Sequence, residues 1–204
     1  MFTIYDPDKK DILQVEEPDP SLRYTYADYL KWRFEERLEL FRGRIFKLSA
    51  PNTRHQEVSG NLFYKVRNYL TGKACKVFSA PFDVRLPMQN KKRDDEVITV
   101  VQPDLCVICD MSKLDDKGCC GAPDMVVEIL SPGNSQKEVQ DKFRLYEEAG
   151  VNEYWIISPA EENIIIYNLQ NGKFIGSKPY APGEFITSSV LTGIEINVAD
   201  IFKY

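Results

Sequence analysis

Two acidic residues interrupt segments that otherwise have the composition of buried strands. Asp104 lies within VITVVQPDLCVIC, and Glu128 lies within MVVEIL. Near-continuous apolar runs are typical of strands covered on both faces of a sheet. A carboxylate in such a place is costly unless it is paired, protonated or bound to a metal. Each residue therefore caps a turn, pairs with an arginine at a strand end, or belongs to a functional site.

A lysine shows the same anomaly on a predicted helix. The segment 136–149 has helical periodicity, and Lys142 lies at about −60° from Val139, inside the apolar arc. The stem of an inward-facing lysine can follow the core surface while its ammonium reaches solvent. The alternative is that the Lys142 ammonium meets the carboxylates at the sheet.

The only histidine of the chain, His55, lies on the inward face of a second predicted helix, residues 54–70. Leu62 and Val66 fall within about 20° of His55 on the helical wheel. A lone histidine on such a face is ordinarily a core residue. Glu39, between two leucines, is likewise compatible with an ordinary half-buried strand.

One shared site would account for all five residues. Carboxylates, an imidazole and a lysine in a crevice between sheet and helices suit a hard cation such as Mg²⁺ or Mn²⁺, with positions left for phosphate oxygens. The metal would lower the pKa of a bound water, and the lysine would steady the attacking water. The pattern therefore favours chemistry on a phosphate group.

The elements that must position these residues form a mixed α/β domain with a central sheet. In chain order we predict a short helix at 26–32, a hairpin at 37–48, a helix at 54–70, extended runs at 75–86, 97–109 and 124–130, a helix at 136–149, a strand at 153–158, a hairpin at 164–174 and a final turn at 198–202.

Helix boundaries carry their own signals. Thr53 with Gln56, and Ser135 with Glu138, have the spacing of capping boxes. Gly150 follows the predicted helix at 136–149, at the position where a left-handed residue commonly ends a helix.

Composition restricts the partners. The 204 residues carry 26 Lys and Arg against 31 Asp and Glu, a net charge of −5, whereas DNA-binding domains are typically basic. Contact with nucleic acid is therefore expected through bound metal and a local basic patch, either Lys91, Lys92 and Arg93 or Arg42 and Arg44.

Cysteine usage and hydropathy bear on compartment. The five cysteines show no spacing of a disulfide framework. Cys106 and Cys109, three apart on a predicted strand, point to opposite faces and are expected to be buried apolar residues rather than zinc ligands.

No apolar run has membrane-spanning length, and the acidic N-terminal segment does not resemble a signal peptide, so a cytoplasmic location is expected.

An ordered series of blocks resembles the Uma2 family, within the PD-(D/E)XK nuclease superfamily. The blocks are Gln102-Pro103-Asp104, residues 127–132 (VEILSP), 142–146 (KFRLY) and 150–156 (GVNEYWI), with upstream matches at 24–30, 38–40, 50–51, His55 and 81–86. The resemblance extends over about residues 22–203. It implies a restriction-endonuclease-like core, a central mixed β-sheet flanked by helices, with additional β-hairpins.

The resemblance also implies roles for individual residues. It makes Asp104 and Glu128 catalytic, metal-binding carboxylates, and it adds Glu39 as a further metal ligand and His55 as a metal ligand or phosphate contact. Leu130 stands where the superfamily usually has its lysine, and Lys142 is the natural substitute as the third catalytic residue.

These observations lead to two functional hypotheses. The first is a cytoplasmic Mg²⁺- or Mn²⁺-dependent endonuclease or nuclease-like phosphodiesterase, acting on DNA as the expected nucleic acid and forming a homodimer. The alternative, favoured by the net charge of −5 and the displaced lysine, is a non-catalytic nuclease-fold module that binds nucleic acid or a protein partner. Residues 1–21 are predicted to form an N-terminal arm and residues 22–204 a single domain.

Overall fold

The principal sheet is mixed and has the order β15-β14-β13-β12-β9-β6 in a computed structural model that describes residues 2–6, 11–15, 21–33, 37–87, 92–132 and 135–203. β12 and β13 run parallel, and the other neighbours run antiparallel. Its strands are β6 (Lys76–Ser79), β9 (Leu105–Ile108), β12 (Met125–Ile129), β13 (Glu153–Ser158), β14 (Asn163–Gln170) and β15 (Lys173–Gly176).

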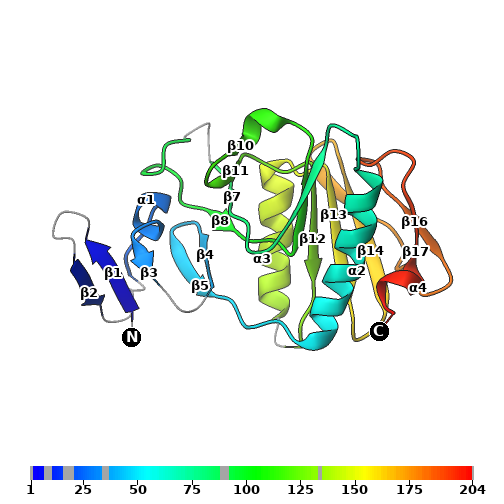
Figure 1. Ribbon diagram of the computed structural model, residues 1–204, viewed down its shortest axis with the longest axis horizontal. Coiled ribbons are helices and arrows are strands. Elements are labelled where there is room, and N and C mark those ends of the chain that lie inside the picture. The colour runs from blue at the N-terminus through cyan, green and yellow to red at the C-terminus, as the bar shows by residue number, and fades with distance from the viewer. Residues whose placement is uncertain are drawn as a thin grey trace.

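Two helices cover opposite faces of this sheet, as Figure 1 shows. Val127 of β12 packs in one core cluster with α2 (Thr53–Tyr69), while its neighbour Val126 packs in another with α3 (Gln136–Ala149). Successive side chains of a strand point to opposite faces, so burial of both explains the apolar composition of β12. The predicted central sheet flanked by helices is present.

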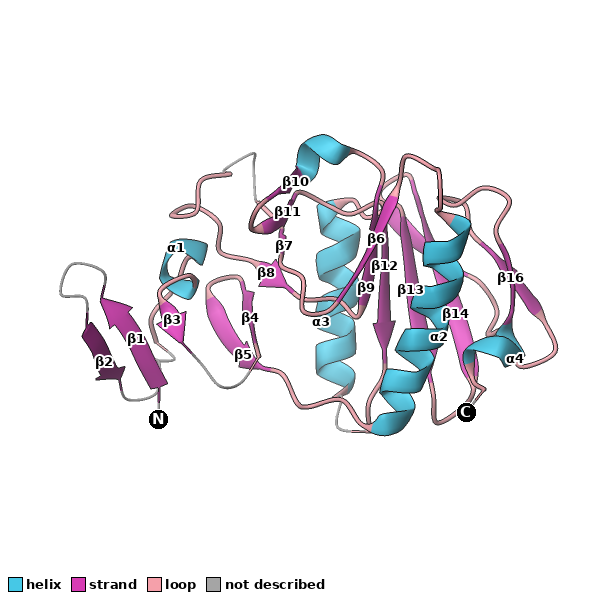
Figure 2. Cartoon of the chain, viewed as in Figure 1, coloured by secondary structure: helices cyan, strands magenta, loops and turns pink. Residues whose placement is uncertain are grey.

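A second mixed sheet lies beside α3 and has the order β10-β11-β7-β8-β4-β5 (Figure 2). Val84 and Cys119 of this sheet share the core cluster of α3. The sheet is preceded by α1 (Tyr26–Tyr29), and η1 (Met111–Lys113) leads into β10. Its strands are β4 (Leu38–Phe41), β5 (Arg44–Lys47), β7 (Val84–Arg85), β8 (Val100–Val101), β10 (Leu114–Asp115) and β11 (Gly118–Cys120).

The two ends of the chain form smaller units. β1 (Phe2–Asp6) pairs with β2 (Asp11–Val15) and with β3 (Trp32–Arg33), so the predicted arm contains a hairpin. Near the C-terminus, β16 (Phe185–Thr187) pairs with β17 (Glu195–Asn197), and α4 (Val198–Ile201) contacts α2. In the part of the chain that the structure describes, every helix is too short or too polar to cross a membrane.

Helix starts follow the sequence signals at α3 but not at α2. The Ser135–Glu138 capping box is present, and Gly150 ends α3 with φ of 82°. The predicted capping box at Thr53 is wrong, because Asn52 is the N-cap and its side chain accepts a hydrogen bond from the His55 backbone. Asparagine is among the best N-cap residues, so the helix begins one residue earlier and Thr53 becomes helical.

The expectation for the cysteines is wrong at one pair. Cys75 and Cys109 form a disulfide, whereas Cys106 is buried and free as expected. β6 and β9 pair antiparallel with Lys76 opposite Ile108. The next pair outward in that register is Cys75 and Cys109, which sequence spacing alone does not reveal.

Candidate active site

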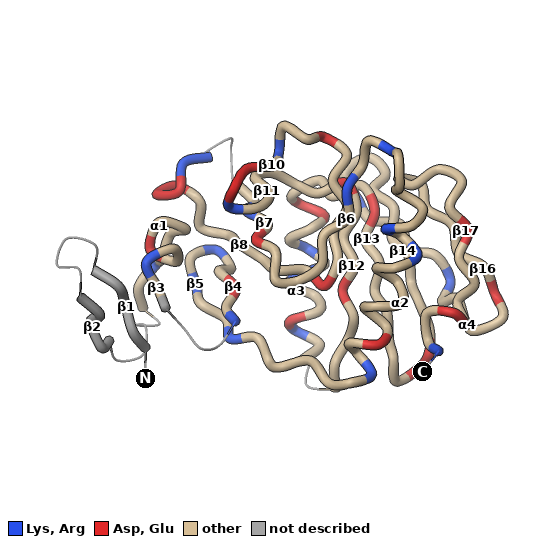
Figure 3. The backbone as a smooth tube through the Cα atoms, in the orientation of Figure 1, with Lys and Arg blue, Asp and Glu red and all other residues tan. Residues whose placement is uncertain are grey.

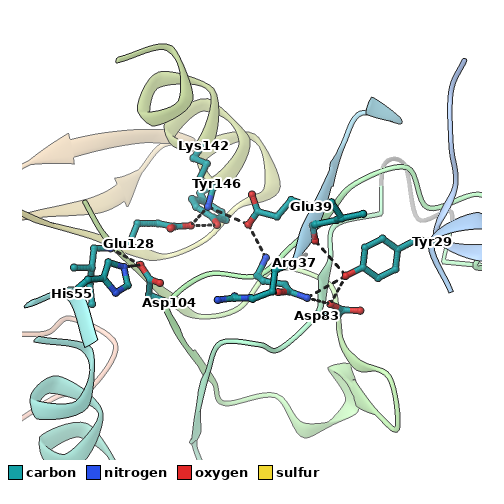
Figure 4. Close-up of polar contacts among 12 residues, drawn as sticks. Tyr29, Arg37, Glu39, His55, Asp83, Asp104, Glu128, Lys142 and Tyr146 are labelled. Carbon is teal, nitrogen blue, oxygen red and sulfur yellow. Dashed lines mark hydrogen bonds and ion pairs between the residues drawn. The ribbon is translucent and has the colours of Figure 1, made fainter. Parts of the chain in front are cut away.

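An open cleft of about 240 Å³ lies where β12 meets the first turns of α2 and α3. Asp104, Glu128, His55, Lys142 and Arg37 are among the residues that line it. Figure 4 shows their polar contacts. Four of the five residues that the sequence singled out therefore face one space.

Strand pairing brings the two predicted carboxylates together. Asp104 directly precedes β9, and β9 pairs with β12 so that Leu105 is opposite Val127. Continuing this register places Asp104 opposite Glu128. Asp104 also accepts a hydrogen bond from the Ile129 backbone, with 2.7 Å between Oδ2 and N.

Lys142 turns inward from α3, as the helical wheel predicts. Its Nζ lies 2.9 Å from Glu128 Oε1 and 3.1 Å from Glu39 Oε1. Burial favours the neutral amine, but the carboxylates of Glu128 and Glu39 outweigh it and raise the pKa of Lys142. Lys142 is therefore a half-buried cation held between two anions, not a lysine that extends to solvent.

Two side chains hold one oxygen of the Glu128 carboxylate. Tyr146 donates a hydrogen bond to the same oxygen that Lys142 contacts, with 2.6 Å between Oη and Oε1. Burial, reinforced by the nearby charges of Asp104 and Glu39, raises the pKa of Glu128 to about 7, although Lys142 and Tyr146 act in the opposite direction. Glu128 therefore takes up a proton more readily than an ordinary glutamate.

Tyr146 is a functional candidate that the sequence analysis does not single out. It follows Lys142 by four positions, and residues four apart share one face of a helix. That spacing was the available signal for a second polar group directed at Glu128. The phenol is fully buried, so its hydroxyl needs a partner, and Glu128 supplies one.

His55 contacts Asp104 from the first turn of α2, with 3.2 Å between Nε2 and Oδ2. Burial lowers its pKa, but the hydrogen bond and charge of Asp104 outweigh burial, and the pKa of His55 is raised. Its other ring nitrogen, Nδ1, is buried and has no hydrogen-bond partner among the residues described. Asn52 fixes the backbone at this position by capping the helix.

Glu39 reaches the site from the second sheet. Its Oε1 accepts hydrogen bonds from Lys142 and from the backbone of Gln102, the latter at 2.9 Å. It is 5% exposed and is not among the residues lining the cleft. The structure thus places Glu39 behind Lys142, with that ammonium between Glu39 and Glu128.

A metal ion fits this donor set only in one way. Within the described ranges, no group of three or more His, Cys, Asp and Glu side chains is arranged to hold a metal, so the predicted ligands Asp104, Glu128, Glu39 and His55 do not form a four-residue cage. Mg²⁺, however, commonly uses one or two carboxylates and keeps several waters.

Two carboxylate oxygens meet that simpler requirement. Asp104 Oδ1 and Glu128 Oε2 accept no hydrogen bond from any described residue, while the other oxygen of each carboxylate is held. Lys142 is one cation among three carboxylates, so two negative charges stay uncompensated once Glu128 is ionised and His55 is neutral. A two-carboxylate site for a hard divalent cation fits both facts.

A mixed sheet lies between two helices, and two carboxylates meet on its adjacent inner strands with a lysine from α3 beside them. A solved structure titled as a "putative nuclease belonging to DUF820" from Anabaena variabilis matches with a TM-score of 0.67 and 19% identity, over 88% of this chain and 97% of that one. This match confirms the predicted fold class.

Sequence comparisons place the chain more narrowly. The family model described as "Uma2: Putative restriction endonuclease" matches residues 26–199. The uncharacterized protein slr1290 of Synechocystis sp. is 27% identical over 152 residues, 73% of this chain and 76% of that protein. The chain belongs to the Uma2 family, and family and fold together support a nuclease-type function.

Proposed function

We propose that the protein is a divalent-metal-dependent endonuclease that hydrolyses phosphodiester bonds of DNA. The observation that carries this proposal is the contact of Lys142 with Glu128 beside Asp104. Leu130, at the usual position of the superfamily lysine, has no ionisable group. The ammonium that the chemistry requires arrives instead from α3.

The roles of the carboxylates follow from their free oxygens. Asp104 and Glu128 would hold Mg²⁺ or Mn²⁺, which supplies an activated water and neutralises phosphate charge. Lys142 is fixed by two carboxylates and is placed to orient the attacking water or the phosphate. Tyr146 holds Glu128 through Oε1, and Oε2 is left without a hydrogen-bond donor among the described residues.

Glu39 and His55 have contacts that suit positioning better than metal binding. Glu39 holds Lys142 and the Gln102 backbone through one oxygen. His55 holds Asp104 through Nε2, the nitrogen that would otherwise be offered to a metal. We therefore assign Glu39 to orienting Lys142, and His55 to orienting Asp104.

The surface charge favours a second candidate function, a nuclease-fold module that binds without cleaving. Lys and Arg are interspersed with Asp and Glu along the coloured part of the trace (Figure 3). Of the predicted basic patches, Arg42 pairs with Glu148 and Arg93 with Asp95, while Lys91 lies outside the described residues. The homodimer also stays a prediction.

Metal-dependent cleavage separates the two functions. Supercoiled plasmid DNA incubated with the protein should be nicked and linearised with Mg²⁺ or Mn²⁺ and stay intact with EDTA. Asp104→Asn should abolish cleavage, because it removes a metal ligand while keeping the side-chain shape. Glu57→Gln, an exposed change on α2, is the matched control and should cleave like the wild type. Equal cleavage by the Asp104 variant would identify a contaminating nuclease and overturn the proposal.

A further inference from the structure

Arg37 differs from the other basic residues of the cleft in what it contacts. Lys142 and His55 each touch a carboxylate. Arg37 instead donates from Nε to the neutral amide oxygen of Gln102, at 3.1 Å. In the part of the chain that the structure describes, no carboxylate lies within ion-pair distance of Arg37. Its positive charge therefore stays available to an anion from outside.

The amide of Gln102 can face Arg37 in only one orientation. Its Nε2 donates to Asp83 Oδ1 at 2.8 Å and to the Tyr29 hydroxyl at 3.1 Å. A carboxylate only accepts hydrogen bonds, so Asp83 requires the NH₂ group on its side and leaves Oε1 toward Arg37. A neutral acceptor fixes one edge of the guanidinium without cancelling its charge.

The same segment connects Arg37 to the carboxylates. Gln102 precedes Asp104 by two residues, and its backbone N–H donates to Glu39. In Figure 4, Arg37 lies between Asp104 on one side and Asp83 with Tyr29 on the other. With Nε engaged, the edge formed by Nη1 and Nη2 makes no hydrogen bond to a described residue and can hold two oxygens of one phosphate.

We propose that Arg37 is a phosphate-binding residue of the substrate cleft and that Gln102 is its positioning residue. This inference rests on the proposed function, because the phosphate belongs to the nucleic-acid strand that Asp104 and Glu128 act on. It explains how a chain with net charge −5 binds a polyanion. The cation that meets the nucleic acid lies inside the cleft and is held by a neutral amide, whereas Arg42 and Arg93 on the surface are paired with acids.

Binding without cleavage tests the assignment. A fluorescein-labelled DNA duplex of about 20 base pairs is titrated by anisotropy in Ca²⁺, at several salt concentrations, with the probe checked for integrity. Arg37→Met should weaken binding about tenfold to hundredfold, the scale of one charge-assisted contact. It should also reduce the steepness of log Kd against log salt by about 0.9, the contribution of one neutralised phosphate.

Three further variants distinguish charge, orientation and general damage. Arg37→Lys should keep the salt slope but lose part of the affinity, since it keeps the charge without the fork. Gln102→Met should weaken binding less than Arg37→Met, and the double variant should be no weaker than Arg37→Met alone. Arg67→Met is the control for general damage. Arg67 is exposed and lies on α2 about 18 Å from His55, so its loss should change neither the affinity for DNA nor the salt slope. A purely structural role of Arg37 would leave the salt slope unaltered.

The outcomes separate this inference from the cleavage proposal. Wild-type affinity and slope in Arg37→Met would overturn the role of Arg37 and leave the endonuclease proposal standing. Arg37-dependent binding by a wild type that never cleaves DNA would overturn the endonuclease and support Arg37. A folded wild type that binds no DNA would overturn both. Should Arg37→Met fail to fold, Arg37→Lys and Gln102→Met decide the question through affinity and slope.

Discussion

Lys142 Nζ lies 2.9 Å from Glu128 Oε1, and it reaches that carboxylate from a helix rather than from the strand that carries Glu128. Leu130, two residues after Glu128, is where the superfamily places its lysine. Residues of β12 and of α3 both line the cleft, so a lysine on the helix can reach the Glu128 carboxylate.

Lys142→Met should abolish most cleavage while preserving metal binding. Methionine keeps the apolar stem and removes the ammonium, so the rate should fall by about 10²–10³-fold, the scale for one lost transition-state contact. Initial rates on plasmid DNA and Mn²⁺ calorimetry measure the two effects. Lys137→Met, an exposed change on the same helix, is the control. Full activity in Lys142→Met would remove Lys142 from the mechanism.

Tyr146→Phe should slow cleavage less than Lys142→Met and should weaken metal binding. The variant removes the donor that holds Glu128 Oε1 at 2.6 Å and leaves the ring in place. Losing a hydrogen bond to a charged group costs about 1.5–3 kcal/mol, which corresponds to about tenfold to hundredfold in affinity for the metal. Calorimetry with Mn²⁺ measures it, and the exposed Tyr64→Phe serves as control. Unchanged affinity would show that Lys142 alone orients Glu128.

The metal-free protein should lose stability as pH rises from about 4.5 to about 7. Burial raises the pKa of Glu128 from 4.5 to about 7. Between these pH values the folded state binds more protons than the unfolded state. The contribution of Glu128 to the free energy of unfolding is therefore complete below pH 4.5 and is lost as the pH rises through 7. The change is at most about 3 kcal/mol by linkage.

Urea unfolding in EDTA across this pH range measures the loss. Glu128→Gln cannot ionise at this position and should flatten the pH dependence in the window. It should also be at least as stable as the wild type near pH 8, since it removes a repelling carboxylate. Glu57→Gln should keep the wild-type profile. A Glu128→Gln protein that is markedly less stable at pH 8 would identify Glu128 as a structural ion-pair residue.

Reduction of the Cys75–Cys109 disulfide should destabilise the fold without touching the cleft. The bond joins residues 34 apart in sequence, and closing a loop of that length contributes about 4 kcal/mol in the chain-entropy treatment. Urea unfolding with and without dithiothreitol measures the difference, and Cys75→Ser with Cys109→Ser should reproduce the reduced protein. Cys106→Ser is the control: it keeps the disulfide, so it should still lose stability when dithiothreitol is added.

Local sequence signals were sufficient for the two long helices, for most strands of the principal sheet and for the side chains that break their patterns. The periodicity of residues 136–149, with Ser135, Glu138 and Gly150 at its ends, determined α3 and turned Lys142 inward. Such signals act over about four residues, because caps and helical faces are made by near neighbours. The carboxylates Asp104 and Glu128 were detectable because apolar runs surround them.

Only the tertiary structure decided which residues meet. Glu39 contacts Lys142 across 103 positions, and Cys75 pairs with Cys109, because strand register and the stacking of two sheets against α3 bring these segments together. The role of Gln102 depends on Asp83, Tyr29 and Arg37 at once. These contacts follow from burying whole faces of the sheets, a property of all the strands together that no local stretch of sequence specifies.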